Sequence, residues 1–319
     1  MKLQPLEFEK PVLELEAKLA DLRNSSAASD INLEAEVRRM EEKLEQTRLE
    51  TYSNLTAWQR VQIARHPARP FALDYMQLSF GNFLELHGDR LFSDDAAMPG
   101  GFATIGRHRC VVIGHQKGRD TKENLRRNFG SAHPEGYRKA LRLMRLAEKF
   151  RLPFVSLIDT PGAYPGVGAE ERHISEAIGL NLREMMTLRT PTVAVVIGEG
   201  GSGGALGIGV ADRVLMLENA YYSVISPEGC AAILWKHRKH APEAAAALKL
   251  TGVDLQELGL VDGVVPEPMG GAHQDQSGAV VNLRNAITRQ LDELVKVPTE
   301  EMLEARYAKF RKVGEFALV

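Results

Sequence analysis

The sequence has few cysteines, no long apolar run and no excess of charge of either sign. Cys110 and Cys230 are the only cysteines among 319 residues, and neither belongs to a C-x-x-C pair. This excludes a disulfide scaffold and a cysteine-ligated zinc site within the chain, and it is typical of a reducing compartment. No apolar run approaches the roughly 20 residues that a membrane-spanning helix needs. The formal net charge of −2 gives no global basic field for nucleic acid.

The N-terminal sequence also differs from a secretory signal. "MKLQPLEFEKPVLELE" is acidic and is interrupted by prolines. Together with the two isolated cysteines, this predicts a cytoplasmic protein that does not associate with a membrane. The length of 319 residues suffices for one large domain with an appendage, or for two ordinary domains.

Two helices are predicted in the first 52 residues. Apolar residues recur at helical spacing at Val12, Leu15, Leu19 and Leu22, and again at Leu33, Val37, Met40 and Leu44. "NSSAASD" (24–30) separates the two patterns and offers side chains for capping. We expect residues 1–52 to form a helical hairpin that packs on the rest of the chain or on a partner subunit.

From about residue 70, short β-rich runs alternate with helical stretches. The β-rich runs are 110–114, 153–159, 192–198, 213–217 and 221–226, and the helical stretches include 135–150, 174–188, 230–237, 243–250 and 282–294. A short helix turning into a strand is expected over 255–268. Strands rich in Val and Ile with intervening helices predict an α/β protein whose strands are buried on both faces. We expect one domain over 53–295 and a charged, helical tail over 296–319.

Two glycine-rich segments follow neighbouring predicted strands. One is "DTPGAYPGVGAEERH" (159–173), and the other is "GEGGSGGALGIG" (198–209), with seven glycines in twelve positions. In a parallel α/β sheet the carboxyl ends of the strands are where ligands bind, so two converging loops predict a site. Glycine at this density indicates backbone N–H groups brought close to something negatively charged.

Nucleotide binding is one interpretation of these glycines. No string matches G-x-x-x-x-G-K-[ST], which excludes a P-loop. Gly198, Gly200 and Gly203 do spell G-x-G-x-x-G after a strand, and Glu218 lies twenty residues beyond Gly198. A nucleotide-binding scaffold therefore remains an alternative, although it explains nothing about the loop at 159–173.

A serine hydrolase is a second interpretation. Residues 200–204 match G-x-S-x-G around Ser202, and Asp262 and His273 follow in the chain order of an α/β hydrolase. A segment with so many glycines matches G-x-S-x-G easily by chance wherever it contains a serine. We favour Ser202 as a small residue tolerated in a crowded loop.

An oxyanion hole accounts for the glycines better. Successive N–H groups at the start of a helix, free of side chains, can be aimed at charge that develops in a transition state. This explains why glycines continue into the helix, because a bulky planar ligand must approach the backbone closely. It requires no catalytic Lys, Ser or His.

Five long motifs carry a resemblance to a known family. They are "GHQKGRDTKENLRRNFG" (114–130), "PEGYRKALRLM" (134–144), "IDTPGAYPGVGAEER" (158–172), "VIGEGGSGGALGIGV" (196–210) and "YSVISPEGCAAILWK" (222–236). In this order, with the helical N-terminus and "PEPMGGAH" (266–273), the sequence resembles the alpha subunits of bacterial acetyl-coenzyme A carboxylase carboxyltransferases.

The resemblance implies a crotonase-like (ClpP/crotonase) superhelix of ββα units and an α2β2 assembly with a beta subunit. It implies transfer of a carboxyl group from carboxybiotin to acetyl-CoA, which gives malonyl-CoA for fatty acid synthesis. Biotin would be attached to the biotin carboxyl carrier protein, zinc would lie only in the beta subunit, and biotin carboxylase would join the larger complex. A stand-alone crotonase-type acyl-CoA enzyme is the alternative, and it would need thioester donors and a catalytic Glu within one chain.

The resemblance also assigns residues. Gly203 and Gly204 match the family's oxyanion donors, here for the ureido oxygen of biotin. The residues expected to line the cavity beside them are Gly162, Ala163, Gly166, Gly201 and Ala205.

The charged residues near the loops have less specific interpretations. Five cations lie close together at Lys117, Arg119, Lys122, Arg126 and Arg127. Such a run is usually a solvated helix face, but Lys117 and Arg119 are also candidates for electrostatic docking of acetyl-CoA phosphates or of the carrier protein. Asp159 is expected to cap its loop, the pair at 170–171 to begin a helix, and His173 to lie in a surface loop.

Overall fold

The computed structural model describes residues 5–28 and 33–314, and its core is one mixed sheet of eight strands. The strands are β1 (Gly81–Glu85), β2 (Gly100–Ile105), β3 (His108–Gly114), β4 (Phe154–Thr160), β5 (Thr192–Gly201), β6 (Arg213–Leu217), β7 (Tyr221–Ser223) and β8 (Gly263–Val265). Their order is β1-β2-β3-β4-β5-β6-β8, and β7 pairs with β5. The pairs β1–β2 and β2–β3 are antiparallel, and all the others are parallel.

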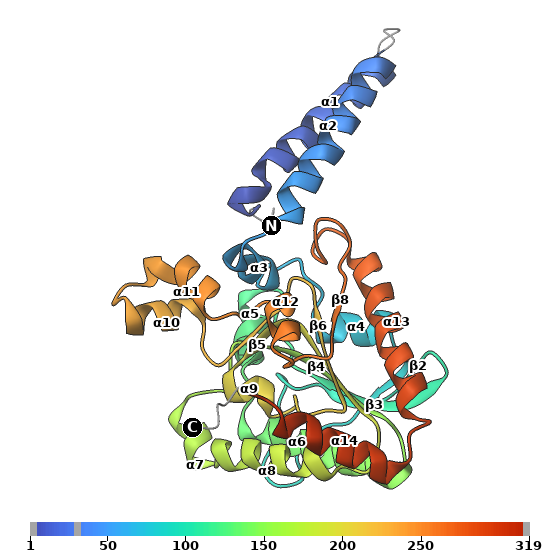
Figure 1. Cartoon of the computed structure of the whole chain (residues 1–319), viewed down its shortest axis with the longest axis vertical. Coiled ribbons are helices and arrows are strands. Elements are labelled where there is room, and N and C mark those ends of the chain that lie inside the picture. Colours follow the sequence, from blue (N-terminus) through green and yellow to red (C-terminus); the bar gives the residue numbers. More distant parts are fainter. Residues whose placement is uncertain (1–4, 29–32, 315–319) are drawn as a thin grey trace.

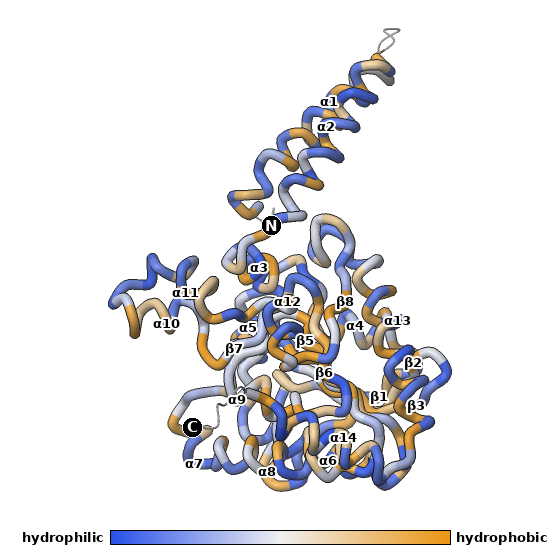
Figure 2. Tube along the Cα trace, in the orientation of Figure 1, coloured by the Kyte–Doolittle hydropathy of each residue, from blue (hydrophilic) through white to orange (hydrophobic). Residues whose placement is uncertain are grey.

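Helices cover both faces of the central strands. Every residue of β4 and β5 is buried. α6 (Pro134–Phe150) packs on β2 and β3, α4 (Ala72–Leu78) packs on β3 and β4, and α13 (Gln276–Leu294) packs on β5 and β8. α6 begins at a proline, whose fixed φ suits the first turn, and presents one buried apolar face. Figure 2 shows the apolar residues concentrated along these strands, as strands buried on both faces require.

A long helical hairpin projects from this body (Figure 1) and consists of α1 (Lys10–Ala28) and α2 (Glu34–Ser53). At its base the buried Glu9 carboxylate accepts a hydrogen bond from the Tyr52 hydroxyl at 2.8 Å and lies 2.7 Å from His273 Nε2. This cluster ties the hairpin to a loop far away in the sequence. No helix in the described ranges is long and apolar enough to cross a membrane.

The remaining helices complete the outer layer. They are α3 (Ala57–Ala64), α5 (Thr121–Arg126), α7 (Val167–Glu171), α8 (Ile174–Thr187), α9 (Ser202–Leu206), α10 (Pro227–Leu234), α11 (Ala241–Ala247), α12 (Gly252–Glu257) and α14 (Thr299–Arg311). α8 packs beside α6, and α14 packs beside α8. α10 and α11 form a second, smaller pair that stands out from the body in Figure 1.

Most of the predicted elements are confirmed, with differences at the start of the chain's body and in the hairpin. The strands β1 and β2 were missed, because β1 is mainly exposed and β2 opens on two glycines, so neither forms a buried Val/Ile run. The predicted separator at 24–30 is helical up to Ala28, and its last two residues lie outside the described residues. The predicted helix in the charged tail is confirmed as α14, which packs on the body. The division into domains at 52 and 295 stays a prediction.

Arg306 explains why α14 packs on the body. The residue is 1% exposed, and its guanidinium donates two hydrogen bonds to Asp212, at 2.7 and 2.8 Å. It also donates to the carbonyl oxygens of Met185, Leu188 and Thr190. One side chain therefore provides hydrogen-bond donors both for the carbonyl oxygens at the end of α8 and for the carboxylate that precedes β6. Removing it would leave a buried charge and three buried acceptors without their partner.

We therefore expect Arg306→Met to lower the free energy of unfolding by about 3–5 kcal/mol, as is typical when one partner of a buried ion pair is removed. The matched control is Arg311→Met on the same helix, where the arginine is exposed and the change should be within about 0.5 kcal/mol. Urea unfolding followed by circular dichroism measures both. Equal stability of the two variants would contradict the assigned role of Arg306.

Candidate active site

The two glycine-rich loops meet backbone to backbone at the carboxyl ends of β4 and β5. A Cβ added at Gly204 would lie 2.4 Å from the amide nitrogen of Ala163 and 2.5 Å from the carbonyl carbon of Gly162. One added at Gly201 would lie 2.2 Å from the carbonyl oxygen of Pro161. No side chain fits at either position. The structure therefore brings the predicted residues of both loops into one place.

Most glycines of the 198–209 segment serve this packing. At six of its seven glycines an added Cβ would lie 2.9 Å or less from another atom of the chain. Gly203 is the exception, because its nearest neighbour would be Ile178 at 3.9 Å. Packing within the chain therefore suffices to explain six of the seven glycines, and room for a ligand remains the explanation for Gly203. Only Gly203 leaves open space beside the backbone.

The segment ends in a sharp turn from strand to helix. Ser202 begins α9 with a φ of +52°, a left-handed conformation that is uncommon outside glycine. Gly203 and Gly204 follow in the first turn, where N–H groups have no acceptor within the helix. The buried Tyr137 hydroxyl donates to the carbonyl oxygen of Gly204 at 3.1 Å and holds the helix from behind. The arrangement can present two adjacent N–H groups to an anion.

The other residues predicted to line the cavity surround this turn. Gly162 is half-buried, and an added Cβ there would meet nothing within 4 Å. Gly166 packs against the ring of Tyr164, and Ala205 is fully buried in the core. Among these residues and those of the turn, open space beside the backbone is therefore found at Gly162 and Gly203.

Beneath the loops lies a buried ion network. Lys117 Nζ is 2.6 Å from Asp159 Oδ1 and 2.7 Å from Glu199 Oε2. The side chains of Lys117 and Asp159 are 13% and 1% exposed. Two sequence-based interpretations are therefore wrong. Lys117 does not lie on a solvated helix face, and Asp159 does not cap its own loop.

Glu199 has further partners that distinguish it from Asp159. Arg65 Nε donates to Glu199 Oε1 at 2.7 Å, and the Tyr221 hydroxyl donates to the same oxygen at 2.7 Å. Burial opposes ionisation of both carboxyls and raises the pKa of Asp159. For Glu199, Lys117 and Arg65 together outweigh burial and lower the pKa to about 2. Glu199 is therefore ionised throughout the neutral range.

Two of the other four cations of the basic segment, Arg119 and Arg127, have structural partners. Arg119 forms an ion pair with Asp74, donates to two backbone carbonyl oxygens and lies over the ring of Phe71. Arg127 pairs with Glu123 and donates to the carbonyl oxygen of Ala96. These contacts fix the α3–α4 connection and α5, which explains Arg119 and Arg127 without a substrate. Lys122 and Arg126 are exposed, as expected for a solvated helix face.

The hydrolase triad is not assembled. His273 lies beside Glu9, and Asp262 accepts hydrogen bonds from Lys309 and from the backbone of Val214. Both side chains are thus engaged away from Ser202. The nucleotide-binding interpretation is not supported either. The helix α9 has only five residues, and Glu218 accepts a hydrogen bond from the backbone N–H of Glu267.

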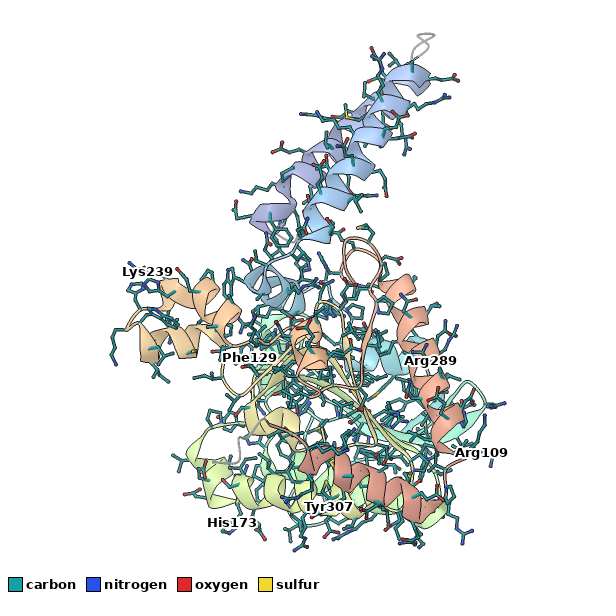
Figure 3. The ribbon with its side chains drawn as sticks, in the orientation of Figure 1. Arg109, Phe129, His173, Lys239, Arg289 and Tyr307 are labelled. Carbon is teal, nitrogen blue, oxygen red and sulfur yellow. The ribbon has the colours of Figure 1, made fainter. Side chains whose placement is uncertain are left out.

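Two further expectations concern the loop at 159–173. Glu170 and Glu171 lie in the short helix α7 and not at the start of α8. His173 is exposed, with a φ of +63°, and Figure 3 shows it at the outer edge of the molecule between α7 and α8. The prediction of a surface position for His173 is confirmed.

Sequence reasoning missed Glu199, Arg65 and Tyr137. Glu199 carried a signal, since it is a lone carboxylate directly after the apolar run Val193–Gly198 of a buried strand, where burial demands a cation. Arg65 lies 134 residues from Glu199 in the chain, and Tyr137 lies 67 residues from Gly204, so no local pattern could indicate either contact.

Solved structures with a similar fold include a transcarboxylase and a malonate decarboxylase. Transcarboxylase 12S aligns with a TM-score of 0.57 and 19% identity over 72% of this chain and 42% of that one. A Pseudomonas malonate decarboxylase hetero-tetramer aligns with a TM-score of 0.56 and 16% identity over 69% of this chain and 90% of that one. These are crotonase-fold proteins, which confirms the predicted fold class.

Relatives matched by sequence are far more similar to this chain than these solved structures are. A family model described as acetyl co-enzyme A carboxylase carboxyltransferase-like matches residues 5–314. An acetyl-coenzyme A carboxylase carboxyl transferase subunit alpha from Thermus thermophilus is 58% identical over 98% of this chain and 99% of its own length. One from Methylococcus capsulatus is 56% identical over 99% of this chain and 98% of its own length. The chain belongs to the family of acetyl-coenzyme A carboxylase carboxyl transferase alpha subunits.

Proposed function

We propose that this chain is the part of a carboxyltransferase that receives the carboxylated biotin, so that acetyl-CoA becomes malonyl-CoA in the first committed step of fatty acid synthesis. The observation that carries the proposal is the meeting of the two glycine loops, which leaves Gly203 as the single open glycine of its segment. We assign the N–H groups of Gly203 and Gly204, in the first turn of α9, to this opening.

The residues present fit biotin, the cofactor that the family implies. Carboxylated biotin would supply the carboxyl group, leaving negative charge on the ureido oxygen. The N–H groups of Gly203 and Gly204 would donate to that oxygen, since donors held in place by the fold stabilise such charge better than water does. Gly162 and Ala163 close the opposite side, and Gly201 and Gly166 shape the two loops. Lys117 and Arg119 are not part of this contact, because their charged groups already have partners within the chain.

As an alpha subunit, the chain works in a complex with other subunits. We assign it a beta subunit in an α2β2 assembly, the biotin carboxyl carrier protein, and biotin carboxylase in the larger complex. The beta subunit supplies the thioester site and the zinc, since Cys110 and Cys230 lie in separate elements and are both buried. Exposed apolar side chains near the loops, at Val167 (73%), Leu206 (42%) and Val224 (77%), support a covering partner. We place the complex in the cytoplasm.

The open side of Gly203 makes a direct test possible. Gly203→Val adds a branched side chain where the ureido ring approaches, and we expect turnover of the assembled complex to fall by about 10²–10³, the usual cost of losing one oxyanion donor. The matched control is Gly179→Val, another helical glycine with open space, which should leave turnover unchanged. A folded, assembled Gly203→Val complex with normal carboxyl transfer would overturn the site.

Gly204 should behave differently, because its constraint comes from the protein itself. Gly204→Ala places a Cβ against the backbone of Ala163, so we expect a loss of thermal stability as well as of activity. Thermal unfolding of the two variants separates the roles of the neighbouring glycines.

The isolated chain should be inactive. It carries donors for only one of the two oxygens that become negative, and catalysis requires both to be stabilised in the transition state. Malonyl-CoA formation from a free biotin analogue should appear only after a matching beta subunit is added. Robust transfer by the purified alpha chain alone would contradict the half-site arrangement.

A further inference from the structure

β5 contains a bulge just before the glycine turn. Ile158 of β4 pairs with Val196, but Thr160 pairs with Gly200, so two steps along β4 correspond to four steps along β5. Extra residues of this kind bend a strand and redirect the chain beyond it. The bulge therefore sets where Gly201 leaves the sheet and where α9 begins.

The Asp159 carboxylate occupies this bulge. Its Oδ1 accepts a hydrogen bond from the backbone N–H of Glu199 at 2.9 Å. A Cβ added at Gly198 would lie 2.5 Å from the same oxygen, so glycine is required there to admit the carboxylate. A side chain thus replaces the strand-to-strand hydrogen bond that the bulge removes.

The position of Asp159 creates an electrostatic problem. Its carboxylate is buried, and the Glu199 carboxylate lies close enough to share a single ammonium group. Two buried like charges repel each other unless a cation lies between them. Lys117, from the connection between β3 and α5, supplies that cation and directs one N–H to each carboxylate.

We propose that Lys117 is a positioning residue for the turn at Gly201–Gly204. By neutralising Asp159 and Glu199, it stabilises the β5 bulge and so keeps this turn in contact with the loop at 161–163. The consequence for carboxyl transfer rests on the proposed function, whereas the effect on the bulge does not. Lys117 never touches the substrate in this arrangement.

Charge removal on either side of the pair tests this role. Lys117→Met should lower kcat about a hundredfold with little change in the KM for acetyl-CoA, because a displacement of about 1 Å has that effect on a preorganised site. Asp159→Asn should be mild, since the amide oxygen still accepts from Glu199 N–H. In the double variant Lys117→Met/Asp159→Asn, Glu199 is the one carboxylate left of the pair, and it keeps its ion pair with Arg65. We therefore expect kcat of the double variant to recover to within about tenfold of wild type. Lys296→Met, an exposed lysine far along the chain, is the control.

Failure to recover in the double variant would overturn the proposal, because a lysine that contacts substrate directly would not be replaced by neutralising Asp159. A large rise in KM for Lys117→Met would do the same. Amide hydrogen exchange of peptides covering 156–166 and 195–206 provides a readout without activity. It should accelerate in Lys117→Met and return towards wild type in the double variant. If the wild-type complex transfers no carboxyl group, the proposed function fails, and the exchange measurement alone still decides the role of Lys117.

Discussion

The contact between two stretches of bare backbone is the constraint on which the site depends. Gly201 and Gly204 lie against residues 161–163 at distances that admit no side chain, so the ends of β4 and β5 are locked together. The close packing of protein interiors makes such a contact nearly rigid. Once it forms, the backbone of Gly203 and Gly204 has a fixed position, which the proposed stabilisation of a transient anion requires.

Buried charge fixes the frame around that contact. Lys117 joins the ends of two strands to the β3–α5 connection, and Arg306 joins α14 to the body. Such pairs contribute little net stability, because desolvation offsets most of the attraction, but losing one partner is costly. In this chain each buried pair links segments distant in sequence, so it favours one arrangement of the loops over its alternatives.

The open space beside Gly203 indicates that this chain forms only part of the site. Under the proposed function the chain supplies donors for one anion, and it exposes apolar side chains nearby, so the second half of the reaction would belong on another surface. In the proposed arrangement, dividing the donors between two subunits would place each reacting oxygen against its own backbone. Water would then be excluded only when both halves are assembled, which would limit unproductive loss of the carboxyl group.

The sequence by itself determined the α/β class, most strands and helices, the two glycine loops and the family, because buried Val/Ile runs, helical periodicity and long motifs are local signals. It predicted that residues near 162 and 204 share a site, since parallel strands end on one edge. Only the tertiary structure decided which glycines pack and which stay open, because that depends on atoms from a distant part of the chain. The same holds for Lys117, whose charge suggested a docking surface until the fold placed two buried carboxylates around it.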